Sequence, residues 1–279
     1  MSVVLVGNND GPLRVARSLR AAGYGGEIRA LLQKRPPPHL ATAYAEAFGV
    51  PEVELAKNDV RLARLVSDRP PKLIVCAFAN FRFRKTLDVA PCVNVHLAPL
   101  PRYRGRHPMH WALINGERAY GVTLHRMNAR FDDGEILWRA LIDVGPLWSV
   151  QTLREALMSR VDAELGAALL QVLAGTRPGQ PNPSGEGYYV PRRYPRDSEL
   201  VEWDDPARLL RKVYALSSGP NPAYLSYEGE RVYVYRGSLH QPEPTSRADL
   251  RDLTRISETT LVARWRNGTT LTLSSELPS

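Results

Sequence analysis

Cysteine and long apolar runs are both scarce in this chain of 279 residues. Its two cysteines, Cys76 and Cys92, are far apart and embedded in apolar sequence, which excludes a disulfide framework and offers no metal-ligand spacing. No apolar run approaches the roughly 18–20 residues of a membrane-spanning helix. The first residues lack the basic leader and cleavage site of a secretory signal. We therefore expect no metal site, no membrane span and a reducing cytoplasm as the compartment.

Lysine is scarce as well, with five among the 37 basic residues. The formal net charge of +8 raises the question of a nucleic-acid partner. The excess of basic over acidic residues is unevenly distributed. Residues 192–279 carry 13 basic and 12 acidic side chains, so nearly all of the excess lies before residue 192. Attraction of an anionic small substrate to the larger N-terminal part explains this distribution as well as RNA binding does.

Short apolar runs alternate with amphipathic segments in the first 80 residues. We expect strands at 3–6, 28–32 and 73–78, and helices at 12–22, 40–48 and 60–66. A longer helix is expected between residues 149 and 175. Strands that alternate with helices of this length predict an α/β fold with a Rossmann-like open, mostly parallel sheet.

The C-terminal third has a different composition. Residues 177–195 are rich in Pro, Gly, Asn and Ser, as linkers are. Short strands are expected beyond them, at 224–227, 231–235, 261–265 and 270–273. The sequence thus predicts three parts, which are a catalytic domain at 1–176, a linker at 177–196 and a small C-terminal β domain at 197–279.

The densest cluster of polar and turn residues lies between Val93 and Asp133. Asn94 and His96 point to the same side of a short strand, roughly 6–7 Å apart. Ligands of open α/β sheets bind at the carboxyl ends of strands, and the loop after a second strand brings Asp132 toward the same edge. An amide that donates to an oxyanion, an imidazole and a carboxylate suit acyl transfer to an amine. From spacing alone, an ordinary loop with a hydrogen-bonded His stays open as the alternative.

Four segments in fixed order resemble the signature of the 10-formyltetrahydrofolate-dependent formyltransferases. They are residues 94–105 (NVHLAPLPRYRG), 111–117 (WALINGE), 121–125 (GVTLH) and 132–134 (DDG). That family includes glycinamide ribonucleotide, methionyl-tRNA and amino-sugar nucleotide enzymes. The resemblance implies that Asn94 is the oxyanion donor, His96 the imidazole and Asp132 the essential carboxylate, with no metal.

The resemblance also implies a co-substrate, 10-formyltetrahydrofolate, held by two loops. The expected contacts are Phe78, Asn80, Phe81, Arg82, Phe83, Asn128, Ala129, Arg130 and Asp132, with core packing as the alternative for Phe81 and Phe83. The expected acceptor contacts are Asn9, Arg104, Gly105, Arg106 and His107, with a structural turn as the alternative for Arg104.

The identity of the amine depends on features outside this centre. Residues 192–197, Trp203 and residues 222–227 are similar to the C-terminal module of methionyl-tRNA and 4-amino-arabinose formyltransferases, a small open, OB-like β barrel. The short segment between Leu32 and Leu40 has no room for the long basic insertion of the tRNA enzymes. This favours a small-molecule amine, a nucleotide-linked amino sugar, over tRNA.

Other acceptors stay open, namely methionyl-tRNA, an amino acid, hydroxyornithine or a carrier-bound amine. The hypothesis from another class is a non-enzymatic RNA-binding protein that uses its terminal barrel. The sequence also leaves the oligomeric state open, a homodimer included.

Overall fold

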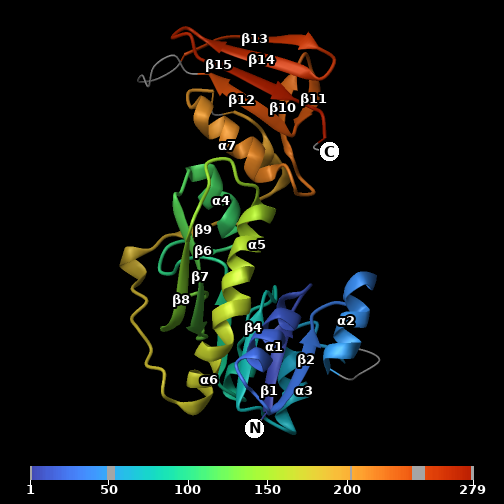
Figure 1. Ribbon diagram of the computed structural model, residues 1–279, viewed down its shortest axis with the longest axis vertical. Coiled ribbons are helices and arrows are strands. Elements are labelled where there is room, and N and C mark those ends of the chain that lie inside the picture. The colour runs from blue at the N-terminus through green and yellow to red at the C-terminus, as the bar shows by residue number, and fades with distance from the viewer. Residues whose placement is uncertain (1, 49–53, 202, 241–248, 278–279) are drawn as a thin grey trace. The chain divides into compact units, whose positions relative to one another are not determined.

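The computed structural model describes residues 2–48, 54–201, 203–240 and 249–277. The chain forms two compact units, and its course can be followed in Figure 1. Unit 1 comprises residues 1–105, 121–142 and 156–189, and unit 2 comprises residues 106–120, 143–155 and 190–279. No helix in the described part of the chain is long and apolar enough to cross a membrane.

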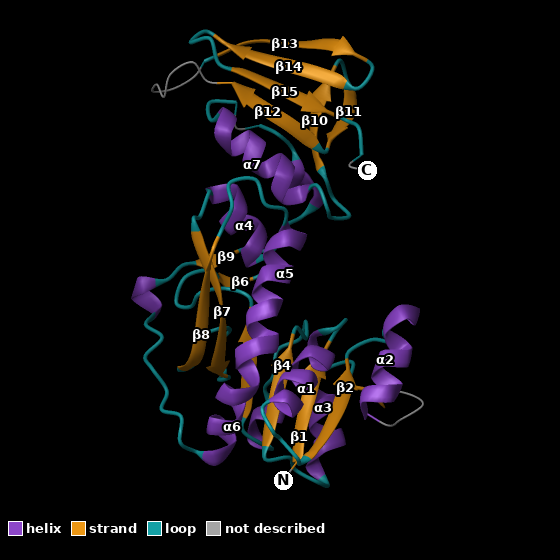
Figure 2. Cartoon of the chain, viewed as in Figure 1, coloured by secondary structure: helices purple, strands orange, loops and turns teal. Residues whose placement is uncertain are grey.

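Unit 1 is built around the predicted sheet, which has seven strands in the order β3-β2-β1-β4-β5-β7-β8. Of these strands, Figure 2 labels β1, β2, β4, β7 and β8. Pairing is parallel from β3 to β5 and antiparallel between β5 and β7. The strands are β1 (Ser2–Gly7), β2 (Glu27–Leu32), β3 (Glu54–Leu55), β4 (Leu73–Ala77), β5 (Cys92–His96), β7 (Ala119–Arg126) and β8 (Ile136–Asp143). The Rossmann-like, mostly parallel sheet is therefore confirmed.

Helices cover both faces of this sheet. Residues of α3 (Asp59–Ser67) share a core cluster with Val4 and Val6, while α1 (Gly11–Ala21) packs Leu13 against Ala30 and Leu32 on the opposite face. The alternation of side chains along β1 and β2 explains why two different helices are needed. The helix α2 (Pro38–Phe48) contributes Tyr44, and the short η1 (Lys85–Asp88) precedes β5.

The long helix expected between residues 149 and 175 is present but widened at its middle. It consists of α5 (Val150–Arg160), a π-helical turn η2 (Val161–Leu165) and α6 (Gly166–Ala174). The Ser18 hydroxyl of α1 donates to Val161 O at 2.9 Å and accepts from Gly166 N at 2.8 Å. One hydroxyl thus replaces a direct backbone hydrogen bond, the kind of insertion that produces a π-bulge.

Unit 2 contains the predicted small β region, with more strands than the four expected. They are β10 (Ala223–Tyr227) with β11 (Glu230–Val234), and β12 (Arg236–His240), β15 (Thr270–Ser274), β14 (Thr260–Trp265) and β13 (Leu250–Ser257), in that order. The helix α7 (Pro206–Leu216) packs against α4 (Pro108–Asn115) and against β12. Trp203 contacts Trp265, and its carbonyl accepts from the Trp265 indole N–H at 2.6 Å.

The units are divided differently from the predicted domains of 1–176, 177–196 and 197–279. Residues 106–120 and 143–155 belong with the C-terminal residues, because α4 packs on α7. Residues 177–189 of the expected linker belong to unit 1, where Gln180 exchanges two backbone hydrogen bonds with Ile136. This segment also contains η3 (Ser184–Glu186), and it leads into β9 (Tyr189–Val190), η4 (Pro195–Ser198) and then α7. Its proline- and glycine-rich composition gave no sign of these bonds.

Candidate active site

The centre of the predicted site lies on two neighbouring strands of unit 1. Asn94 of β5 and His125 of β7 are directly paired in the sheet, and His96 follows two residues later on the same face of β5. Asp132 belongs to the loop between β7 and β8. The structure therefore brings the three predicted residues to one edge of the sheet and adds a fourth, His125.

His96 is buried and held at both ring nitrogens. Its Nε2 lies 3.0 Å from the Tyr103 carbonyl oxygen, which only accepts, so Nε2 carries the proton of the neutral ring. Its Nδ1 lies 3.5 Å from Asp132 Oδ1. A proton added at Nδ1 would face a carboxylate, and this arrangement suits an imidazole that accepts a proton during the reaction.

The His125 ring lies between the Asn94 amide and the Asp132 carboxylate. Its Nδ1 lies 2.7 Å from Arg126 O, so this nitrogen donates and Nε2 accepts from the Asn94 amide at 3.1 Å. Nε2 also lies 3.6 Å from Asp132 Oδ1. One N–H of the Asn94 amide is thus occupied, and the other has no partner among the described residues and is available to an oxyanion.

The main chain at Asp132 is held in a conformation that non-glycine residues seldom adopt, with φ of 53°. Three bonds fix it. Gly105 N donates to Asp132 Oδ2 at 2.9 Å, and Asp132 O accepts from Arg104 Nε at 2.9 Å and from Asn182 Nδ2 at 3.0 Å. Such over-determined strain is typical of functional positions. It fixes the direction of the carboxylate.

The electrostatics of the site favour a neutral imidazole beside an ionised carboxylate. Burial lowers the pKa of His96 below its ordinary 6.5, although the Asp132 charge and the Tyr103 carbonyl work in the opposite direction. Burial disfavours the charge on Asp132, but His96, His125 and the Gly105 N–H outweigh it and lower the pKa of this carboxyl to about 2. At neutral pH, His96 is therefore a base and Asp132 an anion.

This protonation pattern predicts the acid side of the pH–rate profile. We expect kcat to fall as the pH decreases, with an inflection below 6.5, because protonated His96 can no longer act as a base. Asp132→Asn removes the charge that supports the imidazolium, so the residual activity should lose its inflection or show it at still lower pH. Steady-state rates between about pH 5 and 9 check both expectations. An inflection above 6.5 in the unmodified protein would contradict them.

The two loops predicted to hold the folate are linked to each other. The Arg82 guanidinium donates to Ala129 O and lies 5.0 Å from the centre of the Phe131 ring. Asn80 N donates to Gln33 Oε1, and Asn128 Oδ1 accepts from Arg130 N. Phe78 adopts φ of 71° and its carbonyl accepts from the Asn8 amide. The two loops are therefore in direct contact through Arg82 and Ala129.

Phe83 differs from the expected cofactor contacts. Its side chain is fully buried within the core cluster that includes Val4 and Cys76, and its ring stacks on Phe81. Because the Phe83 side chain is buried in the core, it supports the loop by packing and has no surface to offer a ligand. The core-packing alternative therefore describes Phe83, while Phe81 is half-buried at the edge of that cluster.

The residues predicted to contact the acceptor divide into two groups. Arg104 is buried and donates to Asn182 and to Asp132 O, contacts that fit the structural alternative for its side chain. Gly105 contributes its N–H to Asp132, and Asn9 is exposed after β1 with its carbonyl bound to the Tyr44 hydroxyl. Arg106 and His107 are exposed residues of unit 2, where His107 Nδ1 accepts from Arg193 N.

A basic cavity of about 560 Å³ lies in unit 1, where β1, β2 and β4 end and β3 lies. Its lining contains three cations and no acidic side chain; the residues are Asn8, Gln33, Lys34, Arg35, Leu55, Lys57 and Asn80. Sequence analysis did not single out the three cations because Lys57 lies on a different segment from Lys34 and Arg35. Their convergence at the carboxyl edge of the sheet favours an anionic ligand.

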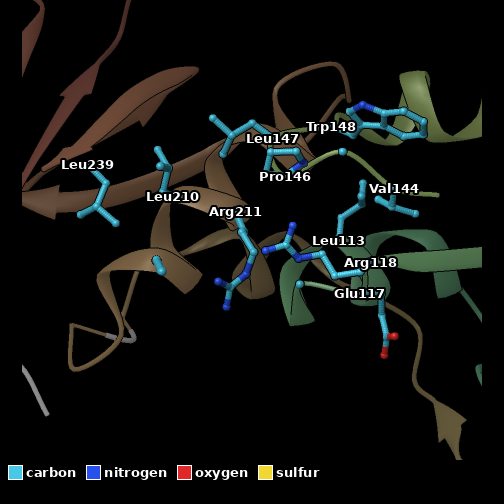
Figure 3. A pocket seen from close by; sticks show the side chains of 13 residues that line it. Leu113, Glu117, Arg118, Val144, Pro146, Leu147, Trp148, Leu210, Arg211 and Leu239 are labelled. Carbon is cyan, nitrogen blue, oxygen red and sulfur yellow. The ribbon is translucent and has the colours of Figure 1, made fainter. Parts of the chain in front are cut away.

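Unit 2 contains a smaller cavity of about 210 Å³ along the packing of α4 on α7 (Figure 3). Leu113, Leu210 and Leu147 give it an apolar wall, and Arg118 and Arg211 border it. Its volume is below the about 300–1,000 Å³ of ligand pockets, so it is a gap in helix packing.

In the described part of the chain, no group of three or more His, Cys, Asp or Glu side chains is arranged to hold a metal ion.

Comparisons of the structure show the same fold in solved proteins. An N-formyltransferase from Helicobacter canadensis, solved with folinic acid and dTDP-3-aminofucose, has a TM-score of 0.74 at 12% identity, with 98% of each chain covered. HypX from Aquifex aeolicus, solved with tetrahydrofolic acid, has a TM-score of 0.63 at 17% identity. That match covers 97% of this chain but 43% of HypX.

Sequence comparisons establish the family. A methionyl-tRNA formyltransferase from Moorella thermoacetica is 31% identical over 269 residues, which cover 89% of this chain and 83% of the relative. The model of the formyl transferase family matches residues 30–173, more than half of the chain and the whole segment that contains Asn94, His96, His125 and Asp132. The chain therefore belongs to the formyl transferase family, enzymes that transfer a formyl group.

Proposed function

We propose that this enzyme transfers the formyl group of 10-formyltetrahydrofolate to the primary amine of a nucleotide-linked amino sugar. The observation that carries the proposal is the cluster of Asn94, His96, His125 and Asp132, which lies at the same sheet edge as a basic cavity. The cluster contains an oxyanion donor, a base and a carboxylate but no covalent nucleophile. An amine supplies its own nucleophile, so this set is sufficient for direct transfer.

The residues can be assigned to atoms of the reaction. The acceptor nitrogen attacks the formyl carbon, a C–N bond forms, and the carbonyl electron pair moves to oxygen. The second N–H of Asn94 stabilises this oxyanion. His96 Nδ1 takes the proton that the amine loses, directly or through water, and Asp132 stabilises the imidazolium. The bond from the formyl carbon to N10 then breaks, and the proton passes to N10.

Unsatisfied polar atoms in unit 1 fit a bound folate. Asn8 Oδ1 and Arg82 Nε are both buried without a hydrogen-bond partner. Asn8 donates to Phe78 O and Arg82 donates to Ala129 O, so both belong to the two predicted folate loops or bind them directly. Buried polar groups are normally paired, and a ligand with donors and acceptors along one edge would complete both.

The basic cavity supports an anionic acceptor. Lys34 and Arg35 follow β2 and Lys57 follows β3, so at the usual strand spacing they start about 14–19 Å from the end of β5, and the long lysine and arginine side chains can span part of this distance. A diphosphate at Lys34, Arg35 and Lys57 could therefore belong to a molecule whose amine reaches Asn94 and His96. The cavity of about 560 Å³ is also of ordinary size for a small ligand.

The test compares acceptors and charge variants. We expect N-formylation of a nucleotide-linked amino sugar in a panel of dTDP- and UDP-linked amines, read from tetrahydrofolate release. The combined substitutions Lys34→Ala, Arg35→Ala and Lys57→Ala should raise KM about tenfold with kcat nearly unchanged, because exposed cations each contribute modestly to binding.

The matched control removes three exposed cations elsewhere in unit 1, by Arg17→Ala, Arg61→Ala and Arg64→Ala. It changes the net charge equally and should leave KM unchanged. An equal rise in KM for both triple variants would mean that overall charge, and not the cavity, attracts the acceptor.

Methionyl-tRNA is the second candidate acceptor. The supporting observation is the 31% identity to the Moorella methionyl-tRNA formyltransferase over most of both chains. The short segment between β2 and α2 argues against it, since Gln33 to Pro37 leaves no room for a long insertion. Efficient formylation of methionyl-tRNA at physiological salt, with none of the amino sugars accepted, would favour this candidate instead.

A further inference from the structure

Unit 2 contains a third cavity, of about 450 Å³, whose lining is basic. It is bordered by the first turn of α5, by the residues that follow α7, and by Arg193 and Tyr194 after β9; these elements are labelled in Figure 1. No acidic side chain lines it. The cavity belongs to unit 2 alone and shares no residue with the basic cavity of unit 1.

Arg193 is the unusual residue of this cavity. Its side chain is 9% exposed, and its Nε has no hydrogen-bond partner. One terminal nitrogen donates to Ser198 Oγ at 2.8 Å. Within the described ranges, no carboxylate lies within the 4.0 Å of an ion pair with this guanidinium. Burial lowers the pKa of Arg193, and the charge of Asp197 offsets this only in part. A buried cation is normally paired, because burying it alone is costly, so Arg193 lacks a direct ion-pair partner.

Other donors surround the same space. His110 Nδ1 is buried without a partner, and Arg154 lines the cavity from the second turn of α5. Val150 and Gln151 begin α5, and the first N–H groups of a helix have no partner within the helix. A helix N-terminus with an adjacent unpaired arginine is a strong anion site.

The remaining lining indicates what the anion is attached to. Tyr194 is half-exposed, with the guanidinium groups of Arg192 and Arg196 at 5.6 and 5.1 Å from its ring centre. Leu216 and Pro220 add apolar surface. An aromatic ring beside phosphate donors suits a planar base or a sugar ring joined to phosphate.

We propose that this cavity binds the diphosphate of a nucleotide, with Arg193 as the cation that pairs with a phosphate oxygen. The inference depends on the residues of unit 2 and does not require that the acceptor be an amino sugar. The diphosphate has two sources, which are an acceptor that carries it or a separate nucleotide.

The first experiment is calorimetric titration of pyrophosphate, UDP, dTDP and uridine into the full-length protein with Lys34, Arg35 and Lys57 replaced by Ala, so that the cavity of unit 1 does not contribute. The three diphosphates should bind, and uridine should bind at least tenfold more weakly. Arg193→Met should weaken diphosphate binding by about tenfold or more, as the loss of a charge-assisted hydrogen bond does. Arg236→Met, an exposed arginine of unit 2 outside the cavity, is the matched control and should change nothing.

Arg193→Met could unfold the segment, so a second measurement leaves the protein unchanged. The Nε–H resonance of Arg193 in ¹⁵N-labelled protein should shift when pyrophosphate is added, since that hydrogen is the unpaired donor. Diphosphate binding that Arg193→Met leaves intact, or a resonance that does not move at saturation, would overturn the proposal.

Two further experiments distinguish the two sources of the diphosphate and separate this proposal from the function proposed for unit 1. Measured in the triple variant at Lys34, Arg35 and Lys57, inhibition by UDP or dTDP that is competitive with the amine acceptor and is lost with Arg193→Met indicates the acceptor's own diphosphate. Non-competitive binding indicates a separate nucleotide. The triple variant at Lys34, Arg35 and Lys57 should retain the Arg193-dependent affinity. If tRNA protects Arg193 while small diphosphates do not bind, a macromolecular partner occupies the cavity and the proposal is wrong.

Discussion

Replacing Asn94, His96 or Asp132 singly by Ala should lower kcat by at least ~10²-fold, the scale of losing an oxyanion donor or an acid–base group. Each variant removes one member of a connected cluster, so the losses should not add in double variants. The folate affinity should change much less, because the two folate loops bind each other through Arg82 and Ala129 outside this cluster. Stopped-flow rates at saturating donor and calorimetric titration of a non-reactive folate analogue check both parts.

Asp133→Ala is the matched control for Asp132→Ala. The neighbouring carboxylate is half-buried, accepts from Asn128 Nδ2 at 3.4 Å and lies 4.0 Å from an Arg130 nitrogen. It makes no contact with His96 or His125 in the described structure. We expect less than a ~10-fold effect on kcat, the scale of a support residue. A larger loss for Asp133→Ala than for Asp132→Ala would show that the carboxylate has been assigned to the wrong residue.

Gly134→Ala should lower both stability and kcat, although Gly134 touches no reacting atom. A Cβ at this position would lie 2.0 Å from Arg126 O, so the β7–β8 loop would have to move. We expect a loss of ~2–3 kcal/mol in the free energy of unfolding, in the range of overpacked sites. A loop displaced by about 1 Å would misplace Asp132 and lower kcat by ~10²-fold. Denaturant unfolding and steady-state kinetics measure the two effects.

Gly185→Ala provides the comparison for Gly134→Ala. A Cβ at Gly185 meets no atom within 4 Å, and its φ lies outside the left-handed region. The free energy of unfolding should therefore change by no more than about 0.5 kcal/mol, the ordinary scatter of surface substitutions, and kcat should stay unchanged. If Gly134→Ala behaves in the same way, the close approach to Arg126 O does not constrain the loop that holds Asp132.

The sequence predicted the sheet of unit 1 well because its signals are local. Buried parallel strands appear as short apolar runs, and β1 and β4 are buried along nearly their whole length. The strands β12 and β13 were missed since their side chains alternate only weakly between buried and exposed. The π-helical turn at 161–165 depends on the Ser18 hydroxyl, more than 140 residues away, and no local pattern could reveal it.

The site shows the same limit. The alternation along β5 placed Asn94 and His96 together, but it gave no indication that His125 of β7 would join them. Its position follows from the antiparallel register that pairs it with Asn94, which the sequence of β7 alone does not specify. Asn182 was hidden in a segment that resembled a linker, yet its amide binds the carbonyls of Asp132 and Gly134. Both residues act through non-local contacts.

The central claim is direct transfer of a formyl group from the folate to an amine, and an isotope experiment tests it most directly. The protein would be incubated with 10-formyltetrahydrofolate labelled with ¹³C at the formyl carbon and with the accepted amino sugar. Our account predicts labelled N-formyl product equal in amount to the tetrahydrofolate released, with both lost in His96→Ala. Release of tetrahydrofolate together with labelled formate and an unlabelled amine would contradict it, because the same residues would then serve hydrolysis.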